Sequence, residues 1–398
     1  MDIYKKAIDL HKKLHGKLEI KPKFQVRTKK DLSLVYTPGV AEVSREIAKK
    51  PELARDLTIK GNAVAIISDG SAVLGLGNIG PYGAIPVMEG KALLFKEYAG
   101  IDAFPLTVAT QEAFEIVNLV KNIAPVFAGI NLEDISAPRC FEIEDALQDI
   151  GIPVFHDDQH GTAIVLLAAL INASKLAGKK LTDLKVVISG AGAAGTAISN
   201  LLLCVGHDKS ICEPVREVIV CDTQGIINRS RPDIQNNPWK MRLAQITNRK
   251  DLSGSLSDAI SGADVFIGVS KGDVFKGSLI KKMNIKPIIF AMANPVPEIM
   301  PDVAKKYGAF IVGTGRSDFP NQVNNVLAFP GVFLGALQAR AKIITNGMKI
   351  GAAFALASCV KKPTVDNILP SPLDKSVPKV IAKEVARIYK REQKLYSL

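Results

Sequence analysis

Cysteines are few in this sequence, and no two of them have the spacing of a metal or redox motif. The 398 residues contain five, at positions 140, 204, 212, 221 and 359, and none forms a Cys-x-x-Cys pair. This distribution argues against a zinc site or a redox centre built on cysteine pairs. We therefore expect five free thiols in a reducing compartment.

Long apolar runs without charge are also missing. Residues 1–17 are charged and amphipathic, so they do not resemble a secretory signal, and the longest apolar run, 162–173, is too short to span a membrane. These absences predict a cytoplasmic protein that does not bind membranes.

Acidic residues are outnumbered, with 39 Asp and Glu against 51 Lys and Arg and a net charge of +12. The basic residues are scattered except near the ends of the chain, and no nucleic-acid-binding motif accompanies them. The charge therefore favours small anionic molecules as partners rather than nucleic acid.

The length and pattern predict two α/β domains. An apolar content of 47% with 23% charged residues is typical of globular proteins, and 398 residues suffice for two cores. We expect a small catalytic domain with a parallel sheet over residues 1–178, and a dinucleotide-binding domain with C-terminal helices over 179–398.

Two short apolar runs of the first half each end in a pair of acids. Residues 126–132 lead into Glu133 and Asp134, and residues 152–155 lead, through His156, into Asp157 and Asp158. The segment between them, 138–150, has helical periodicity, which predicts a strand–helix–strand unit with parallel strands. The four carboxylates should converge at one edge of the sheet. Adjacent residues of a strand point to opposite faces, so we expect each pair of acids to lie in a loop after its strand.

Four converging carboxylates would repel one another unless a cation lay between them. Oxygen ligands suit Mg²⁺ or Mn²⁺, so the pattern predicts a divalent metal site. The alternative is a set of solvated loop acids. A second alternative is a zinc hydrolase, because His156 to His160 resembles His-Glu-x-x-His with Asp in place of Glu. That motif requires a helix, whereas His156 closes a strand, so we interpret His160 as a first-turn or capping residue.

A glycine motif opens the second half. A buried strand over 184–189 precedes Gly190-Ala-Gly192-Ala193-Ala194-Gly195, a helix follows from Thr196, and a second strand over 218–222 ends at Asp222. This context predicts dinucleotide binding, with the glycines near a pyrophosphate and Asp222 near a ribose. The acid favours NAD, whereas Arg229 and Arg231 could attract the additional phosphate of NADP, so the preference stays open.

Strands predicted over 264–269, 287–293 and 309–312 complete this sheet. Asn294 and Asn325 follow the ends of the last two, where open sheets bind ligands, and both are candidates for cofactor or substrate contacts. Loop asparagines without a ligand are the alternative.

Taken together, the motifs of most of the chain resemble those of the short bacterial and archaeal malic enzymes. The motifs are Tyr36-Thr-Pro-Gly-Val40, Leu74–Gly80, Ile85-Pro-Val followed by Lys91, Asn131-Leu-Glu-Asp134, Phe155–Ala163, the glycine motif, Asn294-Pro295 and Asn324–Gly331. The resemblance implies oxidative decarboxylation of (S)-malate to pyruvate and CO₂, with NAD(P)⁺ and Mg²⁺ or Mn²⁺.

The resemblance also implies residue roles. Lys91 would be the general base, Tyr36 the general acid, and Asp157 the partner of Lys91. Glu133, Asp134 and Asp158 would ligate the metal, and Asn294 and Asn325 would hold substrate. The same likeness implies a homodimer with its active site near the subunit interface.

One position departs from the family pattern. Ala72 stands where larger members carry an arginine for the substrate carboxylate, so Arg27, Arg316 or a residue of a second subunit must replace it. Two alternatives remain beside the malic reaction: a dehydrogenase of another hydroxy or amino acid, and a malolactic-type decarboxylase.

Overall fold

A parallel four-stranded sheet organises the first half of the chain. The computed structural model describes residues 3–73, 75–206 and 212–396, so Leu74, the first residue of the Leu74–Gly80 motif, lies outside the described part. The sheet has the order β2-β1-β3-β4, with every pair parallel. Its strands are β1 (Ala63–Ser68), β2 (Asp102–Thr107), β3 (Gly129–Leu132) and β4 (Val154–His156).

Helices connect these strands as expected for parallel pairs. The helix α5 (Gly80–Ala99) links β1 to β2, α6 (Ala113–Ile123) precedes β3, and α7 (Arg139–Asp145) links β3 to β4. The helix α8 (Asp157–Ala177) follows β4 directly. The predicted strand–helix–strand unit around the four acids is therefore confirmed.

The start of α8 differs from our expectation. We placed Asp157 and Asp158 in a loop, with helix from residue 163, but both acids lie in the first turn of α8. Acids are favourable at a helix N-terminus because the unpaired backbone N–H groups there carry partial positive charge. A helical turn also aims consecutive side chains in different directions, which lets the two acids make different contacts.

A six-stranded sheet forms the second half, in the order β10-β9-β8-β5-β6-β7. All its pairs are parallel except β6 with β7. The strands are β5 (Lys185–Ser189), β6 (Glu217–Asp222), β7 (Gly225–Ile226), β8 (Val265–Gly268), β9 (Ile288–Ala291) and β10 (Ile311–Thr314). Its helices are α9 (Ala193–Leu202), α10 (Pro238–Ile246), α11 (Leu256–Ala259) and α12 (Pro301–Lys306). This is the doubly wound, Rossmann-type arrangement that the glycine motif predicted.

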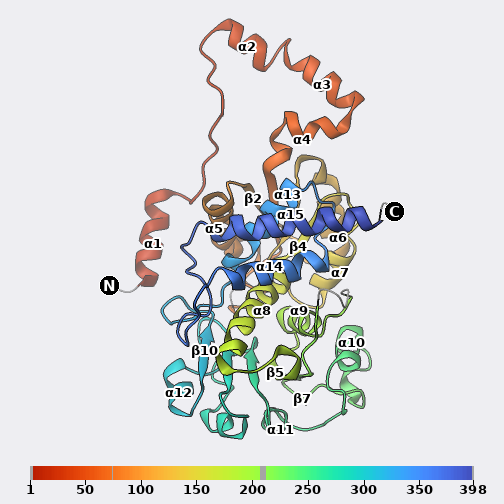
Figure 1. Cartoon of the computed structure of the whole chain (residues 1–398). Coiled ribbons are helices and arrows are strands. Elements are labelled where there is room, and N and C mark those ends of the chain that lie inside the picture. Colours follow the sequence, from red (N-terminus) through yellow and green to blue (C-terminus); the bar gives the residue numbers. More distant parts are fainter. Residues whose placement is uncertain (1–2, 74, 207–211, 397–398) are drawn as a thin grey trace.

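Three C-terminal helices lie next to the first sheet and its helices (Figure 1). These are α13 (Phe329–Gln338), α14 (Asn346–Ser358) and α15 (Val377–Tyr396), which confirm the expected C-terminal helices. One hydrophobic core joins Val64 of β1, Val186 of β5 and Phe333 of α13 through the residues of α8. The division at residue 178 therefore stays a prediction, because the two sheets share this core.

The helix α8 is long and apolar enough to cross a membrane by length and composition alone. Its most apolar window, however, is 78% buried inside the chain. Burial of this extent is typical of a core helix, and α8 packs between the two sheets.

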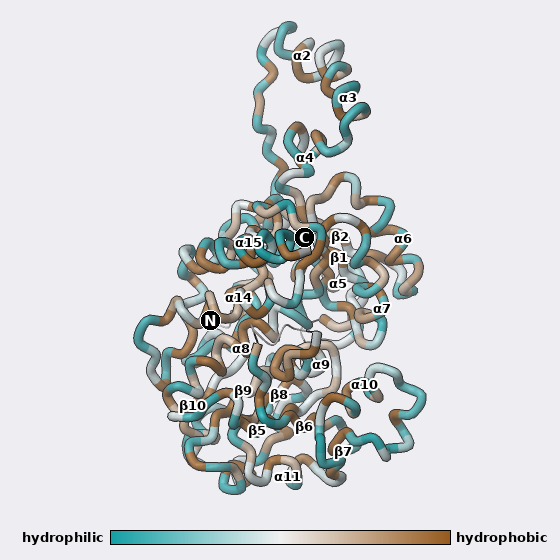
Figure 2. The backbone as a smooth tube through the Cα atoms, turned by 45° about the vertical axis from the view of Figure 1, so that its right-hand side comes forward, coloured by the Kyte–Doolittle hydropathy of each residue, from teal (hydrophilic) through white to brown (hydrophobic). Residues whose placement is uncertain are grey.

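Two of the N-terminal helices, α2 (Lys29–Val35) and α3 (Val40–Lys49), project from the body, while α1 (Ile3–Leu14) lies beside it (Figure 1). The helix α4 (Ala54–Leu57) contacts the body, where Arg55 donates to the Leu337 carbonyl at 2.7 Å. None of these helices contains a buried residue. Figure 2 shows brown, hydrophobic segments in the projecting part. Leu34 and Tyr36 there are 65% and 67% exposed. An exposed apolar surface of this kind marks a contact site.

The expectation of five free thiols is wrong for two cysteines. Cys204 and Cys212 form a disulfide, with a Cα–Cα distance of 5.8 Å. Cys204 lies just after α9, and Cys212 follows it by eight residues. A search for Cys-x-x-Cys spacing could not detect a pair with this separation. Cys140, Cys221 and Cys359 are free.

Candidate active site

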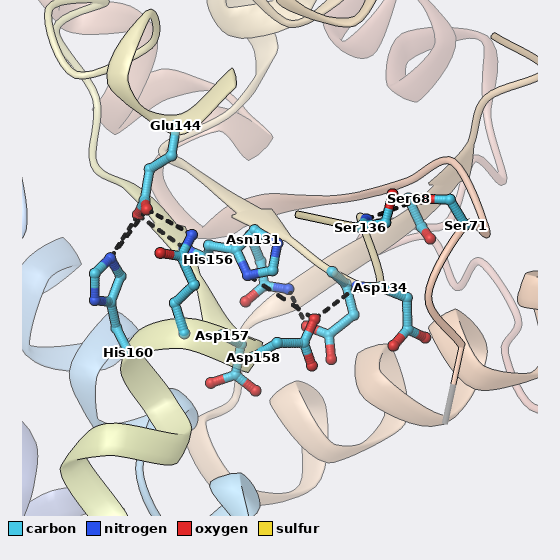
Figure 3. A network of polar contacts seen from close by, with 12 residues as sticks. Ser68, Ser71, Asn131, Asp134, Ser136, Glu144, His156, Asp157, Asp158 and His160 are labelled. Carbon is cyan, nitrogen blue, oxygen red and sulfur yellow. Dashed lines mark hydrogen bonds and ion pairs between the residues drawn. The ribbon is translucent and has the colours of Figure 1, made fainter. Parts of the chain in front are cut away.

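The four predicted acids converge at the carboxyl ends of β3 and β4. Single oxygens of Glu133, Asp134 and Asp158 all lie within 4.8 Å of one another. The Asp134 backbone N–H donates to Asp158 Oδ2 at 2.8 Å, which ties the two strand ends together (Figure 3). Glu133 and Asp134 are 5% and 4% exposed, whereas the Asp158 side chain is 35% exposed, so the cluster is buried on one side and open to solvent at Asp158.

Lys91 reaches this cluster from α5. Its Nζ lies 2.7 Å from Glu133 Oε1 and forms an ion pair with Asp157 Oδ2. It also lies 4.2 Å from the centre of the Phe329 ring. The lysine is 7% exposed, so its ammonium is buried beside these acids.

The charges in this pocket do not balance. Burial opposes a charge on Lys91, but the carboxylates of Asp157 and Glu133 more than offset it and raise the pKa of the lysine. Burial raises the pKa of Asp157, Glu133 and Asp158, although Lys91 opposes the rise. One cation thus faces four acids.

The donor set fits a divalent cation. The buried carboxylates of Glu133 and Asp134 converge with the partly exposed one of Asp158, and the buried Asp157 Oδ1 has no hydrogen-bond partner within the described chain. Oxygen ligands and excess negative charge suit Mg²⁺ or Mn²⁺. The residues that would hold it are Glu133, Asp134 and Asp158.

The two histidines do not form a zinc site. His156 ends β4 with its ring buried and 3.8 Å from Asp158, whereas the His160 ring contacts both Glu144 oxygens at 2.9 and 3.0 Å (Figure 3). Among the described residues, the one cluster with metal-ligand geometry is the acidic one. The zinc hydrolase interpretation has no geometric support.

Glu144 is a buried acid that the sequence reasoning missed. It accepts hydrogen bonds from the His156 backbone N–H at 3.1 Å and from Gln159 Nε2 at 3.0 Å, besides its contact with His160. These bonds fix the start of α8, and with it Asp157 and Asp158. No motif marks Glu144, because it lies within a helix of unremarkable sequence.

Of the two asparagines from the second half of the chain, Asn325 lies beside this site, and Asn294 packs against the glycine-rich loop after β1. Asp157 and Asn325 are both neighbours of Gly161 in α8. A Cβ added at Gly161 would collide with the Asp157 carboxylate and would lie 3.3 Å from the Asn325 Cβ, so Asn325 lies next to that acid. A Cβ on Gly75 would lie 2.2 Å from the Asn294 carbonyl oxygen. The loop of the Leu74–Gly80 motif therefore packs on Asn294 and requires glycine at position 75, whose φ is +73°.

Tyr36 lies away from these residues. It follows α2 in the projecting N-terminal part, at 67% exposure, whereas Lys91 and the acids lie in the body (Figure 1). Of the predicted catalytic residues, the structure brings Lys91 and Asp157 together within one chain but not Tyr36.

The arginines proposed to replace the one missing at Ala72 are engaged elsewhere. Arg27 donates to Gln25, and Arg316 pairs with Asp318 while donating to the Pro295 carbonyl at 3.1 Å. Arg139, which the sequence reasoning missed, donates to the buried Asp69 of the same loop as Ala72 at 3.0 Å. Its Nε is buried without a partner in the described chain.

A cavity of about 550 Å³ lies at the glycine motif. Gly190, Gly192, Asp222 and Lys240 line it, and Pro138 and Phe141 border it from the other sheet. Ala193, Ala194 and Gly195 form the first turn of α9, whose N-terminus starts at this cavity. A helix N-terminus beside glycines is a pyrophosphate site. Because Pro138 follows Asp134 by four residues, the acidic cluster and the cavity are neighbours.

The fold and these two adjoining sites define a nicotinamide-dependent oxidoreductase with an acidic pocket beside its dinucleotide cavity. Two family models match: malic enzyme, N-terminal domain, over residues 15–115, and malic enzyme, NAD binding domain, over residues 159–389. The chain belongs to the malic enzyme family.

Individual relatives agree with this assignment. The bifunctional malic/malolactic enzyme of Bacillus subtilis is 53% identical over 390 residues, which cover 97% of this chain and 93% of the relative. The NADP-dependent malic enzyme of Rhizobium meliloti is 48% identical over 365 residues, covering 91% and 46%. The crystal structure of the NAD-dependent malic enzyme of Thermotoga maritima has a TM-score of 0.91 and 49% identity, covering 96% of this chain and 98% of that one.

Proposed function

We propose that this chain oxidatively decarboxylates (S)-malate to pyruvate and CO₂ with reduction of NAD⁺ or NADP⁺. The observation that carries the proposal is the contact of Lys91 with Glu133 and Asp157, in a chain that also has a cavity at its glycine motif. A bound divalent cation would polarise the hydroxyl oxygen and one carboxylate of malate, and the nicotinamide would take the hydride.

Lys91 takes the proton from the C2 hydroxyl of malate. A lysine acts as a base only when it is neutral, and here Glu133 and Asp157 hold it charged. A cation held by Glu133 would weaken the field of that carboxylate on Lys91 and so would favour the neutral form of the lysine. Asp157, with no exposed surface, holds the Lys91 nitrogen in place, and its negative charge balances the ammonium that forms when Lys91 takes the proton.

Asn294 and Asn325 would orient the substrate from the second half of the chain. Both lie at loops after strand ends of the six-stranded sheet, and Asn325 adjoins Asp157. Amide side chains donate to carboxylates without adding charge, which suits a dianionic substrate in an acidic pocket.

Tyr36 would protonate C3 of the enol to complete pyruvate, and we propose that a second copy of the chain supplies it. The projecting arm, residues 29–49, has no buried residue, and its apolar side chains lack a covering surface in the described chain. A homodimer in which each arm covers its partner would bury these side chains and deliver Tyr36. The cytoplasm remains the expected location.

A malolactic reaction is the second candidate, favoured by the printed name of the Bacillus relative. It would yield lactate and CO₂ without net reduction of the nucleotide. Incubation with (S)-malate, either nucleotide and Mn²⁺ separates the two, because the proposed reaction forms pyruvate and reduced nucleotide in equal amounts. Lactate without reduced nucleotide would favour the alternative. Turnover of other hydroxy or amino acids, but not of malate, would contradict both.

A further inference from the structure

A second cavity, of about 220 Å³, lies between the helices α7, α8, α9, α10 and α14. The rings of Phe141 and Trp239, whose centres lie 4.6 Å apart, border both this cavity and the one at the glycine motif. Gly190, Gly192 and Asp222 line only the cavity at the glycine motif. The cavity between the five helices, called the helix cavity below, is therefore a separate site.

Lys349 of α14 brings an ammonium without an acceptor to the helix cavity. Its one hydrogen-bond contact in the described chain is with His160 Nε2 at 3.3 Å. That ring nitrogen lies closer to both oxygens of Glu144, at 2.9 and 3.0 Å, so it donates its proton to this carboxylate (Figure 3). A protonated ring nitrogen cannot accept a hydrogen bond, which leaves Lys349 as a donor without an acceptor.

The two acids that line the helix cavity do not pair with this ammonium. Glu144 is buried, and its oxygens already accept hydrogen bonds from three groups around the start of α8. Asp145 is exposed at the rim, as is Arg242. Both acids attract Lys349 through space only, and burial outweighs that attraction and lowers the pKa of the lysine. A cation in such surroundings is stabilised by an anion that binds next to it.

Asn200 of α9 supplies the opposite kind of group to the helix cavity. Its Oδ1 is buried and has no hydrogen-bond donor in the described part of the chain. Apolar side chains, among them Leu201 and Leu243, form much of the remaining wall. A buried acceptor without a donor costs free energy, so a ligand that donates to Asn200 would be bound more tightly.

We infer that the helix cavity binds a small α-amino or α-hydroxy acid with an apolar side chain. The carboxylate of the ligand would accept hydrogen bonds from Lys349, and its α-ammonium or α-hydroxyl group would donate to Asn200 Oδ1. The apolar side chain would lie against Leu201 and Leu243. A single ammonium beside the buried Glu144 suits a singly charged carboxylate better than a phosphate dianion.

Lys349, Asn200 and the apolar wall belong neither to the acidic cluster nor to the glycine motif. Binding in the helix cavity therefore does not depend on the proposed malate reaction, and its failure and the failure of that reaction are measured separately.

Four compounds compared by calorimetry test the chemistry of the ligand. L-Valine or (S)-2-hydroxy-3-methylbutanoate should bind the wild-type chain, and the tighter of the two identifies the class of acid. 3-Methylbutanoate, which lacks the α donor, should bind about two- to tenfold more weakly than this acid. L-Valinol, which lacks the carboxylate, should bind at least about tenfold more weakly because the contact with a charged group is lost.

Two variants test the residues. Lys349→Met keeps the length of the side chain without its charge and should weaken binding of the acid at least about tenfold. Asn200→Ala should lower the affinity for the acid to that for 3-methylbutanoate and leave 3-methylbutanoate binding unchanged. Lys342→Met is the matched control, because Lys342 is exposed and does not line the cavity, and it should bind normally.

A wild-type chain that binds none of the four compounds, or binds all four equally, would overturn the inference. Glu133→Gln should bind the acid normally, since Glu133 does not line the helix cavity. Loss of binding in Glu133→Gln but not in Lys349→Met would place the ligand in the acidic cluster and would also overturn it. If Lys349→Met does not fold, the comparison of Asn200→Ala with the wild type decides.

Discussion

Lys91 Nζ lies 2.7 Å from Glu133 Oε1, which joins the helix after β1 to the end of β3 in one buried ion pair. Because the same ammonium also meets Asp157, its position is fixed from two strand ends. This contact connects the proposed base with a proposed metal ligand.

Replacing Lys91 by alanine should remove malate oxidation. Loss of a positioned base costs about 10²–10⁴-fold in kcat. Lys96→Ala is the matched control, because Lys96 lies on the same helix with its side chain 59% exposed, and it should retain activity. Steady-state kinetics with either nucleotide measures both. Normal turnover by Lys91→Ala would remove the lysine from the mechanism.

Glu133→Gln and Asp158→Asn should weaken Mn²⁺ binding. Each change removes a charged ligand oxygen, and we expect losses of at least about tenfold in affinity, since even outer-shell changes cost 10–100-fold. Titration calorimetry on EDTA-treated protein gives the affinity directly. Glu97→Gln on α5, a surface acid with 54% side-chain exposure, is the control. Unchanged affinity in both ligand variants would place the cation elsewhere.

Mixing two inactive variants should restore activity if Tyr36 acts across subunits. If Lys91→Ala and Tyr36→Phe chains pair at random, about half of the dimers contain one chain of each kind. Each mixed dimer has one intact site, made of Lys91 from one chain and Tyr36 from the other. About a quarter of the wild-type activity should therefore return. The measurement is activity after denaturation and joint refolding, with separately refolded variants as controls. If Tyr36 acts within its own chain, the mixture stays inactive.

The arm should also hold the dimer together. Leu34→Asp places a charge on an apolar side chain that is 65% exposed in one chain, so a fold defect is not expected. Light scattering coupled to gel filtration should show monomers for this variant and dimers for the wild type. Lys30→Asp, on the polar side of α2, serves as the charge control. Dimers of normal stability in Leu34→Asp would argue against the arm contact.

Asp264 gives a pH-dependent contribution to stability. Burial would raise its pKa, but hydrogen bonds from Lys179, the Lys185 backbone N–H and Asn284 lower it further than burial raises it. The folded pKa is therefore below the unfolded value near 3.8. The stabilisation is present above about pH 4 and is lost as the pH falls through the folded pKa.

Asp264→Asn should therefore destabilise the protein at pH 7 by about 1.5–3 kcal/mol, the range for hydrogen bonds to charged groups. The difference from the wild type should shrink below pH 3. Urea unfolding at the two pH values measures it. A difference that does not change with pH would show that the carboxylate charge is not the source.

The convergence of the acids was predictable, because parallel strands place their ends at one edge whatever surrounds them. Glu133, Asp134, Asp157 and Asp158 follow two such strands. The same reasoning located the dinucleotide cavity, because the glycine-rich turn between the first strand and helix of such a sheet is where a dinucleotide's phosphates bind.

Contacts set by tertiary packing were not predictable. Glu144 and Lys240 reach their partners through helices whose local sequence carries no signal, and the Cys204–Cys212 disulfide depends on where a loop returns. The exposure of Tyr36 depends on an arm that does not fold back on its own chain. Local sequence patterns and the pairing of strands do not determine which side chains from distant segments come into contact.

Crystals of the chain soaked in MnCl₂ provide the most direct test, through an anomalous difference map collected at the manganese edge. We expect one strong peak bounded by Glu133, Asp134 and Asp158, absent from crystals of Glu133→Gln. A map without density between these carboxylates, or with a peak at His156 and His160 instead, would contradict a metal-dependent reaction at this site.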